Sequence, residues 1–487
     1  MNWRILLPFL ALSSVSATAQ TTTNPAIPTL SQARSITLNG TPLNYHVKTG
    51  RLPIRNSDGT IECQMFSASY LKDNEQAGIR PVTFVFNGGP GSATLWLHMG
   101  GLGPKRAPMP PDGSLPAPPY APVDSQETWL DFTDLVFIDA PGAGYSRLEK
   151  DDLKKKFYGV RQDISAFTEF IRLWLSENDR WASPLYIAGE SYGGMRGSGL
   201  SQSLFGAGIA VNGFVSISGT NNFLTLDGMR GNDVTYLSFM PSMADCAWYH
   251  KKLPKRFTSV EQVATETKKW CDEVYGPALL KGDSLTDKEK ESVATQLAMY
   301  LGLSKKFVLG SNLRVSEGAF FKELLREDRL AIGRYDGRLT NSEESAEGGQ
   351  QSNDPSDDAV TAPFYSALND YYTRDLNLRT DLKYLLFGSV WPWENPEGSY
   401  AETSTDLRNL IAANKHFRVM FCCGYYDLAC PFNGSIYTVN HMGLNSDERK
   451  RVSFEYYPAG HMMYIEQSSR KKLHDDVKRF ELAGLGQ

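Results

Sequence analysis

The sequence lacks an excess of positive charge. Its 487 residues include 50 Lys and Arg against 55 Asp and Glu, which gives a formal net charge of -5. Proteins that bind nucleic acid through its phosphates need a basic surface, so we expect no nucleic-acid partner. Apolar residues make up 41% of the chain, which is enough for a sizeable core and is not typical of a disordered protein.

The sequence also lacks an apolar run of the roughly 20 residues that a membrane-spanning helix needs. The apolar run 5–12 is short, follows Arg4 and precedes a small-x-small site at 17–19. This order of features is typical of a secretory signal peptide. We therefore predict that residues 1–19 are a signal peptide, and that the mature protein is soluble, without a membrane span, and exported to the periplasm or secreted.

Cysteine is scarce, and no Cys-x-x-Cys spacing occurs, so we expect no zinc or other metal, and we expect no cofactor. The six cysteines of an exported protein permit disulfides. We expect one or two bridges, with Cys246 and Cys271 as a candidate pair. The neighbours Cys422 and Cys423 point to opposite faces of a predicted strand and should not pair. Cys430 is either a free thiol near the site or part of a disulfide.

A glycine-rich loop, Asn87-Gly88-Gly89-Pro90-Gly91, follows a continuous apolar run at 81–86. Backbone N–H groups of such a loop can bind a phosphate or stabilise an oxyanion. The Gly-Lys-Ser/Thr that should follow in a phosphate-binding loop is missing, which favours the oxyanion. A turn with a purely structural role is the remaining interpretation.

An oxyanion site needs a nucleophile, and the stretch Gly189-Glu190-Ser191-Tyr192-Gly193 supplies a candidate. An apolar strand at 185–188 precedes it, and small residues at 197–199 suit a helix packed tightly on a sheet. The pattern Gly-x-Ser-x-Gly between a strand and a helix is typical of a nucleophile elbow, a sharp turn that strains the serine backbone. The alternative is an ordinary glycine-rich turn.

The order of apolar segments predicts the fold class. Buried strands alternate with helices and glycine loops, which indicates an α/β protein with a mainly parallel, doubly wound sheet and a site at the carboxyl ends of its strands. Besides those above, we predict strands at 135–138, 211–218, 417–423 and 452–457, antiparallel edge strands at 35–48 and 59–70, and helices at 160–175, 260–275, 287–301 and 464–484.

The same pattern suggests a division of the chain. Residues 20–34 are predicted to be a flexible leader, and 35–221 with 411–487 to form the α/β core. Helical patterns dominate 222–410, which we interpret as an inserted cap. Within it, residues 341–358 are rich in Glu, Gly, Ser and Asp, and we expect a flexible acidic loop without chemistry of its own.

Three residues match the requirements of nucleophilic acyl transfer. Such a site needs a serine, a histidine that takes its proton, and a carboxylate that orients the imidazole. In α/β hydrolases they occur in the order Ser, acid, His, each at the carboxyl end of a strand. Ser191, Asp427 and His461 have this order and placement. Individually, Asp427 is also compatible with a turn and His461 with an ordinary loop.

Together with the block 139–146 (Asp-Ala-Pro-Gly-Ala-Gly-Tyr-Ser), these motifs resemble the successive blocks of the serine carboxypeptidases, a family of α/β-hydrolase-fold peptidases, and suggest a bacterial-type secreted member. The resemblance covers most of 80–220 and 415–465. It implies a nucleophile at Ser191, a general base at His461 and an orienting acid at Asp427. It further implies an oxyanion hole from the N–H groups of Gly89 and Tyr192, and assigns Asn87 and Glu190 to binding of the substrate's terminal carboxylate.

The chain departs from the family pattern at two positions. Ser92 stands where the family usually has a cysteine, and Gly101 where it has a glutamate that partners the elbow glutamate. An ionised Glu190 about 4 Å from a substrate carboxylate would be repelled by roughly 4 kcal/mol at an effective dielectric of 20. We therefore expect that Glu190 is protonated or that a cation shields it. Lys105, Arg106 and Arg196 are candidates from their sequence positions.

The resemblance leads to a functional prediction with alternatives. The leading hypothesis is a serine-type carboxypeptidase that removes C-terminal residues from peptides. An esterase or acyltransferase acting on a small acyl substrate would use the same triad, and a non-catalytic binding protein on this fold is a third possibility. We expect the aromatic residues Tyr145, Tyr192, Tyr425 and Tyr426 to line the specificity pocket, together with residues of the cap.

Overall fold

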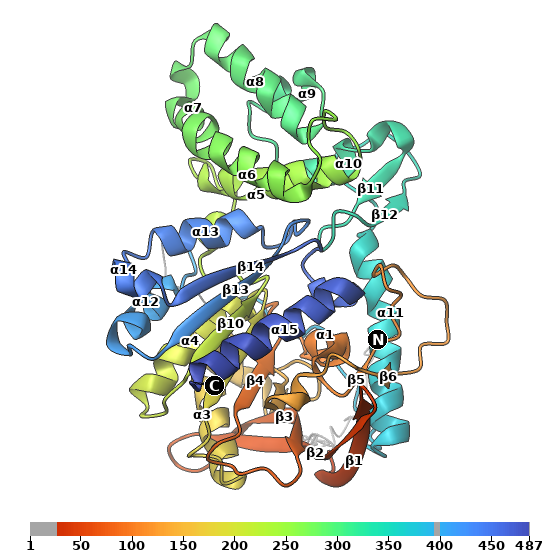
Figure 1. Ribbon diagram of the computed structural model, residues 1–487, viewed down its shortest axis with the longest axis vertical. Helices are drawn as coiled ribbons and strands as arrows, with labels where there is room; N and C mark the ends of the chain where they lie inside the picture. The colour runs from red at the N-terminus through yellow and green to blue at the C-terminus, as the bar shows by residue number, and fades with distance from the viewer. Residues whose placement is uncertain (1–26, 394–399, 487) are drawn as a thin grey trace, which may run out of the picture.

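The centre of the protein is a ten-stranded sheet, seen in a computed structural model that describes residues 27–393 and 400–486 (Figure 1). The strand order is β1-β2-β3-β7-β4-β9-β10-β13-β14, and β8 pairs with β3. These strands are β1 (Leu30–Leu38), β2 (Thr41–Arg55), β3 (Ile61–Lys72), β4 (Val82–Phe86), β7 (Asp134–Ile138), β8 (Arg147–Leu148), β9 (Leu185–Glu190), β10 (Gly213–Ile217), β13 (Arg418–Gly424) and β14 (Val452–Tyr457).

In this order the six strands from β7 to β14 are parallel to one another, whereas β1, β2 and β3 pair antiparallel, and β3 is also antiparallel to β7. Residues of β4, β7, β9 and β10 are buried throughout, as expected for parallel strands covered on both faces. The predicted α/β-hydrolase fold with a mainly parallel sheet is thereby confirmed.

Helices cover both faces of this sheet. The main ones are α3 (Val160–Glu177), α4 (Gly193–Gly206), α12 (Ser404–Ala413) and α15 (Gln467–Gly484). A Cβ added at Gly213 would lie 2.9 Å from the Phe480 ring of α15, whereas a Cβ at Gly197 of α4 would lie 2.2 Å from the Phe214 ring. Because successive residues of a strand point to opposite faces, Gly213 and Phe214 place α15 and α4 on opposite sides of β10.

The amino-terminal edge differs from the prediction. The strand expected at 35–48 is a hairpin of β1 and β2 that turns at Asn39 and Gly40, both with positive φ. An Asn-Gly turn is a strong hairpin signal, so the sequence did contain a pattern that predicts this hairpin. The strand β1 also begins at Leu30, inside the predicted leader 20–34. The predicted signal peptide, residues 1–19, lies outside the described residues.

Between β10 and β13 the chain forms most of its helices. In Figure 1 the helices from α5 to α10 form the upper part of the molecule, and α11 runs down beside the sheet. Their bounds are α5 (Val234–Tyr249), α6 (Val260–Trp270), α7 (Gly276–Lys281), α8 (Asp287–Leu301), α9 (Lys305–Gly310), α10 (Glu317–Glu323) and α11 (Pro355–Asp370), with a small hairpin of β11 (Leu330–Ile332) and β12 (Thr340–Ser342).

The segment 341–358, expected to be a flexible acidic loop, contains ordered structure. It includes the end of β12 and the first turn of α11, where the Asp354 side chain accepts a hydrogen bond from the Ser356 N–H as an N-cap. Glu343 is buried and pairs with Lys322 at 3.0 Å. Acidic residues here cap a helix and form an ion pair, which a compositional argument does not detect.

Short elements complete the connections between the larger strands and helices. They are α1 (Leu95–Leu97), α2 (Lys154–Phe157), α13 (Phe432–Asn440), α14 (Ser446–Arg449) and a separate pair of β5 (Lys105–Arg106) and β6 (Val123–Asp124). Among residues 27–393 and 400–486, no helix has the length and apolar character needed to cross a membrane.

Candidate active site

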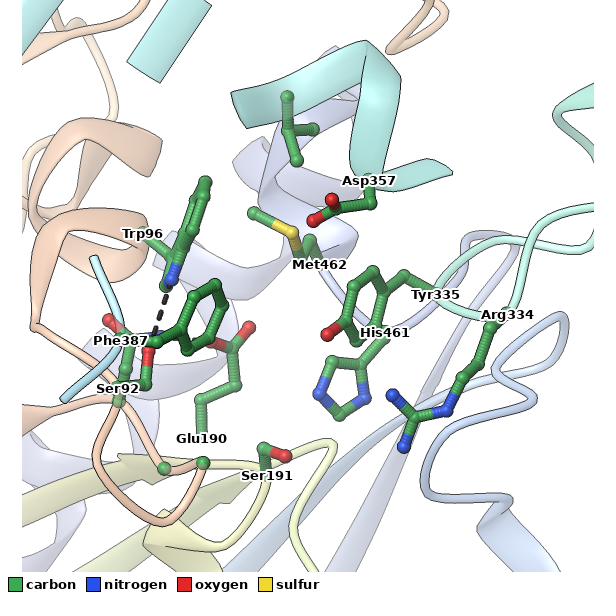
Figure 2. A pocket seen from close by; sticks show the side chains of 14 residues that line it. Ser92, Trp96, Glu190, Ser191, Arg334, Tyr335, Asp357, Phe387, His461 and Met462 are labelled. Carbon is green, nitrogen blue, oxygen red and sulfur yellow. Dashed lines mark hydrogen bonds between the residues drawn. The ribbon is translucent and has the colours of Figure 1, made fainter. Parts of the chain in front are cut away.

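Ser191 occupies a strained turn between β9 and α4. Its φ is 62°, a left-handed conformation that costs energy for a residue with a side chain. A Cβ added at Gly189 would lie 2.2 Å from the carbonyl oxygen of Gly193, so only glycine permits this close approach. The predicted nucleophile elbow is therefore present, and the half-buried Ser191 side chain opens into a pocket (Figure 2).

His461 and Asp427 are hydrogen bonded to each other. The His461 Nδ1 and Asp427 Oδ2 atoms are 2.9 Å apart, and both side chains are almost fully buried. The other oxygen, Oδ1, accepts the N–H groups of Ala429 and Cys430 at 2.8 Å each. Burial lowers the pKa of His461, but the Asp427 carboxylate outweighs it and raises that pKa. Nδ1–H thus donates to Asp427 and leaves Nε2 free to act as a base.

Ser191 and His461 line the same pocket (Figure 2), but within the described residues their side chains are not hydrogen bonded. The Ser191 hydroxyl instead lies against the thiol of Cys430. In structures without substrate, the bond between nucleophile and base is often long and forms only in the complex. Transfer of the Ser191 proton to His461 would require the Ser191 hydroxyl to turn from Cys430 toward the imidazole.

Two backbone N–H groups beside Ser191 have the arrangement of an oxyanion hole. A Cβ at Gly88 would lie 2.4 Å from the backbone nitrogen of Tyr192, and Gly89 has a φ of 103°. The glycine loop thus runs directly against the start of α4. Among the described residues, the N–H groups of Gly89 and Tyr192 donate to no other atom. Both are available for an anionic oxygen at Ser191.

Glu190 is buried at the inner end of the pocket. The Asn87 side-chain amide donates a hydrogen bond to Glu190 Oε2, and Asn87 Oδ1 accepts the Leu97 N–H at 3.0 Å. Burial raises the pKa of Glu190 to about 7, although His461, Tyr464 and Asn87 favour the ionised form. Below about pH 7 the protonated carboxyl predominates, and it can donate a hydrogen bond to a carboxylate.

The three cations considered for shielding do not contact Glu190. Arg196 is buried between Asp163, to which it pairs at 2.7 Å, and the backbone carbonyl of Asn87, to which it donates at 2.6 Å. Lys105 pairs with Asp124 at 2.5 Å, and Arg106 donates to the carbonyl of Ala107. Arg196 thus holds the glycine loop, and of the two expectations for Glu190 its raised pKa favours protonation over shielding by a cation.

Tyr464 lies next to Glu190 and was not identified from the sequence as a residue of the site. A Cβ at Gly100 would lie 2.2 Å from its ring, so the ring packs on the segment where the family's glutamate was expected. A Cβ at Gly101 would meet Arg470 instead, at 2.6 Å. The buried Tyr464 hydroxyl and Glu190 influence each other's protonation. Neither that hydroxyl nor Glu190 Oε1 completes a well-formed hydrogen bond with the described residues, so both buried oxygens keep unused hydrogen-bonding capacity.

The outer walls of the pocket come from segments without a recognisable motif. The Trp96 indole donates to the Ser92 hydroxyl at 3.1 Å, so the residue that replaces the family's cysteine holds an aromatic wall (Figure 2). From the long insertion come Arg334, Tyr335, Asp357, Val360 and Phe387, and Met462 follows His461. The expected tyrosines Tyr145, Tyr192, Tyr425 and Tyr426 are buried and do not line this pocket.

All six cysteines are free and buried, which corrects the expectation of one or two disulfides. Cys246 lies against the carbonyl of Tyr426. Cys271 instead contacts Met240, which lies on α5 six residues before Cys246. The two thiols therefore face different surroundings and do not meet. Burial raises the pKa of Cys246 and Cys271, which suppresses the reactive thiolate. Within the described residues, no group of three metal-ligating side chains is arranged around a common point.

Comparisons with known proteins support the resemblance seen in the motifs. The sequence model of the family described as serine carboxypeptidase matches residues 41–473. Serine carboxypeptidase-like 8 from Arabidopsis thaliana is 28% identical over 204 residues, which is 41% of this chain and 42% of that protein. Serine carboxypeptidase-like 13 from the same plant is 27% identical over 157 residues, 32% of this chain and 34% of that protein. The chain thus spans less than half the length of these relatives.

Among solved structures, a proline iminopeptidase from Mycobacterium smegmatis aligns with a TM-score of 0.40 and 12% identity. That alignment covers 90% of this chain and 99% of the iminopeptidase.

Proposed function

Because the chain belongs to the serine carboxypeptidase family, we propose that it is a serine-type carboxypeptidase that hydrolyses C-terminal residues of peptides through an acyl-enzyme at Ser191. The observation that carries this proposal is the position of Glu190. A buried carboxyl with a pKa raised to about 7 is bonded to Asn87 and opens into the same pocket as Ser191. An esterase has no need of a group that accepts a carboxylate beside its nucleophile.

The proposed reaction starts with His461 as a neutral base. Its Nε2 takes the Ser191 proton while Oγ attacks the last peptide carbonyl, and the resulting oxyanion accepts the N–H groups of Gly89 and Tyr192. His461 then gives this proton to the leaving amino acid. A water molecule, deprotonated by His461, hydrolyses the ester, and Ser191 recovers its proton. Asp427 stabilises the imidazolium in both halves.

We place the terminal carboxylate of the substrate at Glu190 and Asn87. The protonated carboxyl of Glu190 donates one hydrogen bond, and the Tyr464 hydroxyl donates a second. The side chain of the leaving residue then lies among Trp96 and Phe387, whose rings are 6.2 Å apart, so we expect a preference for apolar C-terminal residues. The signal-like residues 1–19 support export to the periplasm or secretion of a bacterial-type member.

Mass spectrometry of one peptide with a free and with an amidated C-terminus tests the proposal. We expect the free acid to lose its last residue and the amide to be cleaved at least tenfold more slowly, because only the free acid bonds to Glu190. The matched control is Ser191→Ala, which should leave both peptides intact. Equal cleavage of the two forms, or cleavage of neither alongside ester hydrolysis, would favour the esterase or acyltransferase alternative.

A further inference from the structure

Arg334 carries an unpaired positive charge into the pocket. Its side chain is exposed and lines the cavity beside His461 (Figure 2). Within the described residues its guanidinium forms no ion pair or hydrogen bond and only lies 5.3 Å from the centre of the Tyr335 ring. Asp357 lines the same pocket without pairing to it. Most other arginines near the pocket, such as Arg338 and Arg196, are paired with aspartates.

The backbone at Arg334 is fastened to the catalytic loops. Its carbonyl accepts the Leu428 N–H at 3.1 Å, next to Asp427, and the Tyr335 carbonyl accepts the His461 N–H at 2.5 Å. The Arg334 N–H donates to Asp354 at 3.1 Å. The guanidinium is therefore held close to the triad by a rigid segment, and only its side chain is free to adjust to a ligand.

Arg334 and Glu190 lie on opposite sides of Ser191 and His461 in Figure 2. The charge of Arg334 acts on His461 and on the Cys430 thiol, which touches Ser191. A substrate whose terminal carboxylate lies at Glu190 places its leaving residue on that side. The residue that is acylated onto Ser191 then extends to the other side, toward Arg334.

We propose that Arg334 selects peptides with an acidic residue immediately before the C-terminal residue, by pairing with the carboxylate of that side chain. This inference rests on the proposed carboxypeptidase activity and adds its substrate class. A planar guanidinium binds a carboxylate through two parallel hydrogen bonds, which a neutral amide cannot reproduce. A lysine at the same substrate position is repelled by Arg334.

The test compares four N-acetyl dipeptides with Glu, Gln, Leu or Lys before a common C-terminal Leu, at about pH 6. There the substrate Glu is ionised and Glu190 is protonated. For the wild type we expect kcat/KM for Glu to exceed that for Gln about tenfold. Arg334→Gln should bring this ratio close to one, and Arg334→Glu should favour Lys over Gln.

Arg329→Gln is the matched control. Arg329 is exposed and directly precedes β11, in the same β11–β12 hairpin that carries Arg334, but it does not line the pocket. Its variant should therefore keep the wild-type ratio of kcat/KM for Glu to that for Gln. Hydrolysis of the Leu dipeptide and fluorophosphonate labelling of Ser191 confirm that each variant is folded. If the ratio of kcat/KM for Glu to that for Gln is the same in the wild type and in Arg334→Gln, the inference about Arg334 is overturned but the carboxypeptidase proposal is not. A wild type that cleaves esters but none of the four peptides would overturn the carboxypeptidase proposal as well.

Discussion

Replacing Glu190 by Gln should remove the decline of kcat/KM for free-acid peptides at alkaline pH. Burial raises the pKa of Glu190 to about 7, so the wild-type carboxyl is neutral below that pH and ionised above it. The neutral form donates to the substrate carboxylate, whereas the ionised form repels it. Glutamine is neutral at every pH and retains an oxygen that can accept the Asn87 hydrogen bond. The Glu190→Gln variant should therefore bind free-acid peptides independently of this ionisation.

The size of the effect follows from the charges. Two carboxylates about 4 Å apart repel by roughly 4 kcal/mol at an effective dielectric of 20, which is about three powers of ten in kcat/KM. Each pH unit above the pKa removes at most a factor of ten of the protonated enzyme. Between about pH 7 and pH 9, kcat/KM for a free-acid peptide should therefore fall about 50-fold, because the protonated fraction of Glu190 falls from about one half to about one hundredth. At still higher pH the residual activity of the ionised enzyme sets a lower limit.

The assay divides kcat/KM for the peptide by kcat/KM for an ester that has no terminal carboxylate. His461 must be deprotonated for both substrates, so its titration cancels, and kcat/KM reports the free enzyme. Between about pH 7 and pH 9 the ratio should fall about 50-fold in the wild type and stay constant in Glu190→Gln. Glu481→Gln is the matched control, since Glu481 is also buried, with its pKa raised to about 8, but bonds to Thr83 away from the pocket. A constant ratio in the wild type, or an equal decline in Glu190→Gln, would refute this account of Glu190.

Three further variants test the other parts of the site. Asp427→Asn should lower kcat about 10⁴-fold for peptides and esters alike, because His461 loses its orienting carboxylate; a loss under tenfold would exclude this role. Tyr464→Phe should lower kcat/KM about tenfold for free-acid peptides only, and an equal loss on esters would contradict a role in carboxylate binding. Gly88→Ala should lower kcat at least about 100-fold by displacing the oxyanion hole, whereas Gly206→Ala, with open space around its Cβ, should leave kcat unchanged.

The loops that carry Ser191, Asp427 and His461 were predictable because each carries a local signal. A strand, a sharp turn and a helix are encoded by adjacent residues around Ser191, and parallel strands bring their carboxyl ends to one edge of the sheet. The positions of Asp427 and His461 after β13 and β14 therefore follow from the order of the strands. The packing of α4 on β10 was likewise indicated by Gly197, whereas Gly199 packs against Ile164 of α3.

The outer half of the pocket could not be predicted in the same way. Arg334 is held at the site because its carbonyl accepts the Leu428 N–H and the carbonyl of its neighbour Tyr335 accepts the His461 N–H. These bonds join segments far apart in the chain, and no sequence pattern around Arg334 indicates them. Tyr464 replaces an expected partner of Glu190 through packing on Gly100, which depends on the fold. The disulfide guess failed because sequence proximity of Cys246 and Cys271 says nothing about the direction of their side chains.

The central claim is that Ser191 forms an acyl-enzyme, an ester with the substrate peptide that has lost its C-terminal residue. Rapid quenching of the protein with a free-acid peptide, followed by mass spectrometry of the digested protein, measures this directly. We predict an adduct with the mass of the peptide lacking its C-terminal residue, located on the fragment that contains Ser191. No such adduct on Ser191, together with peptide hydrolysis that persists in Ser191→Ala, would contradict the proposed mechanism.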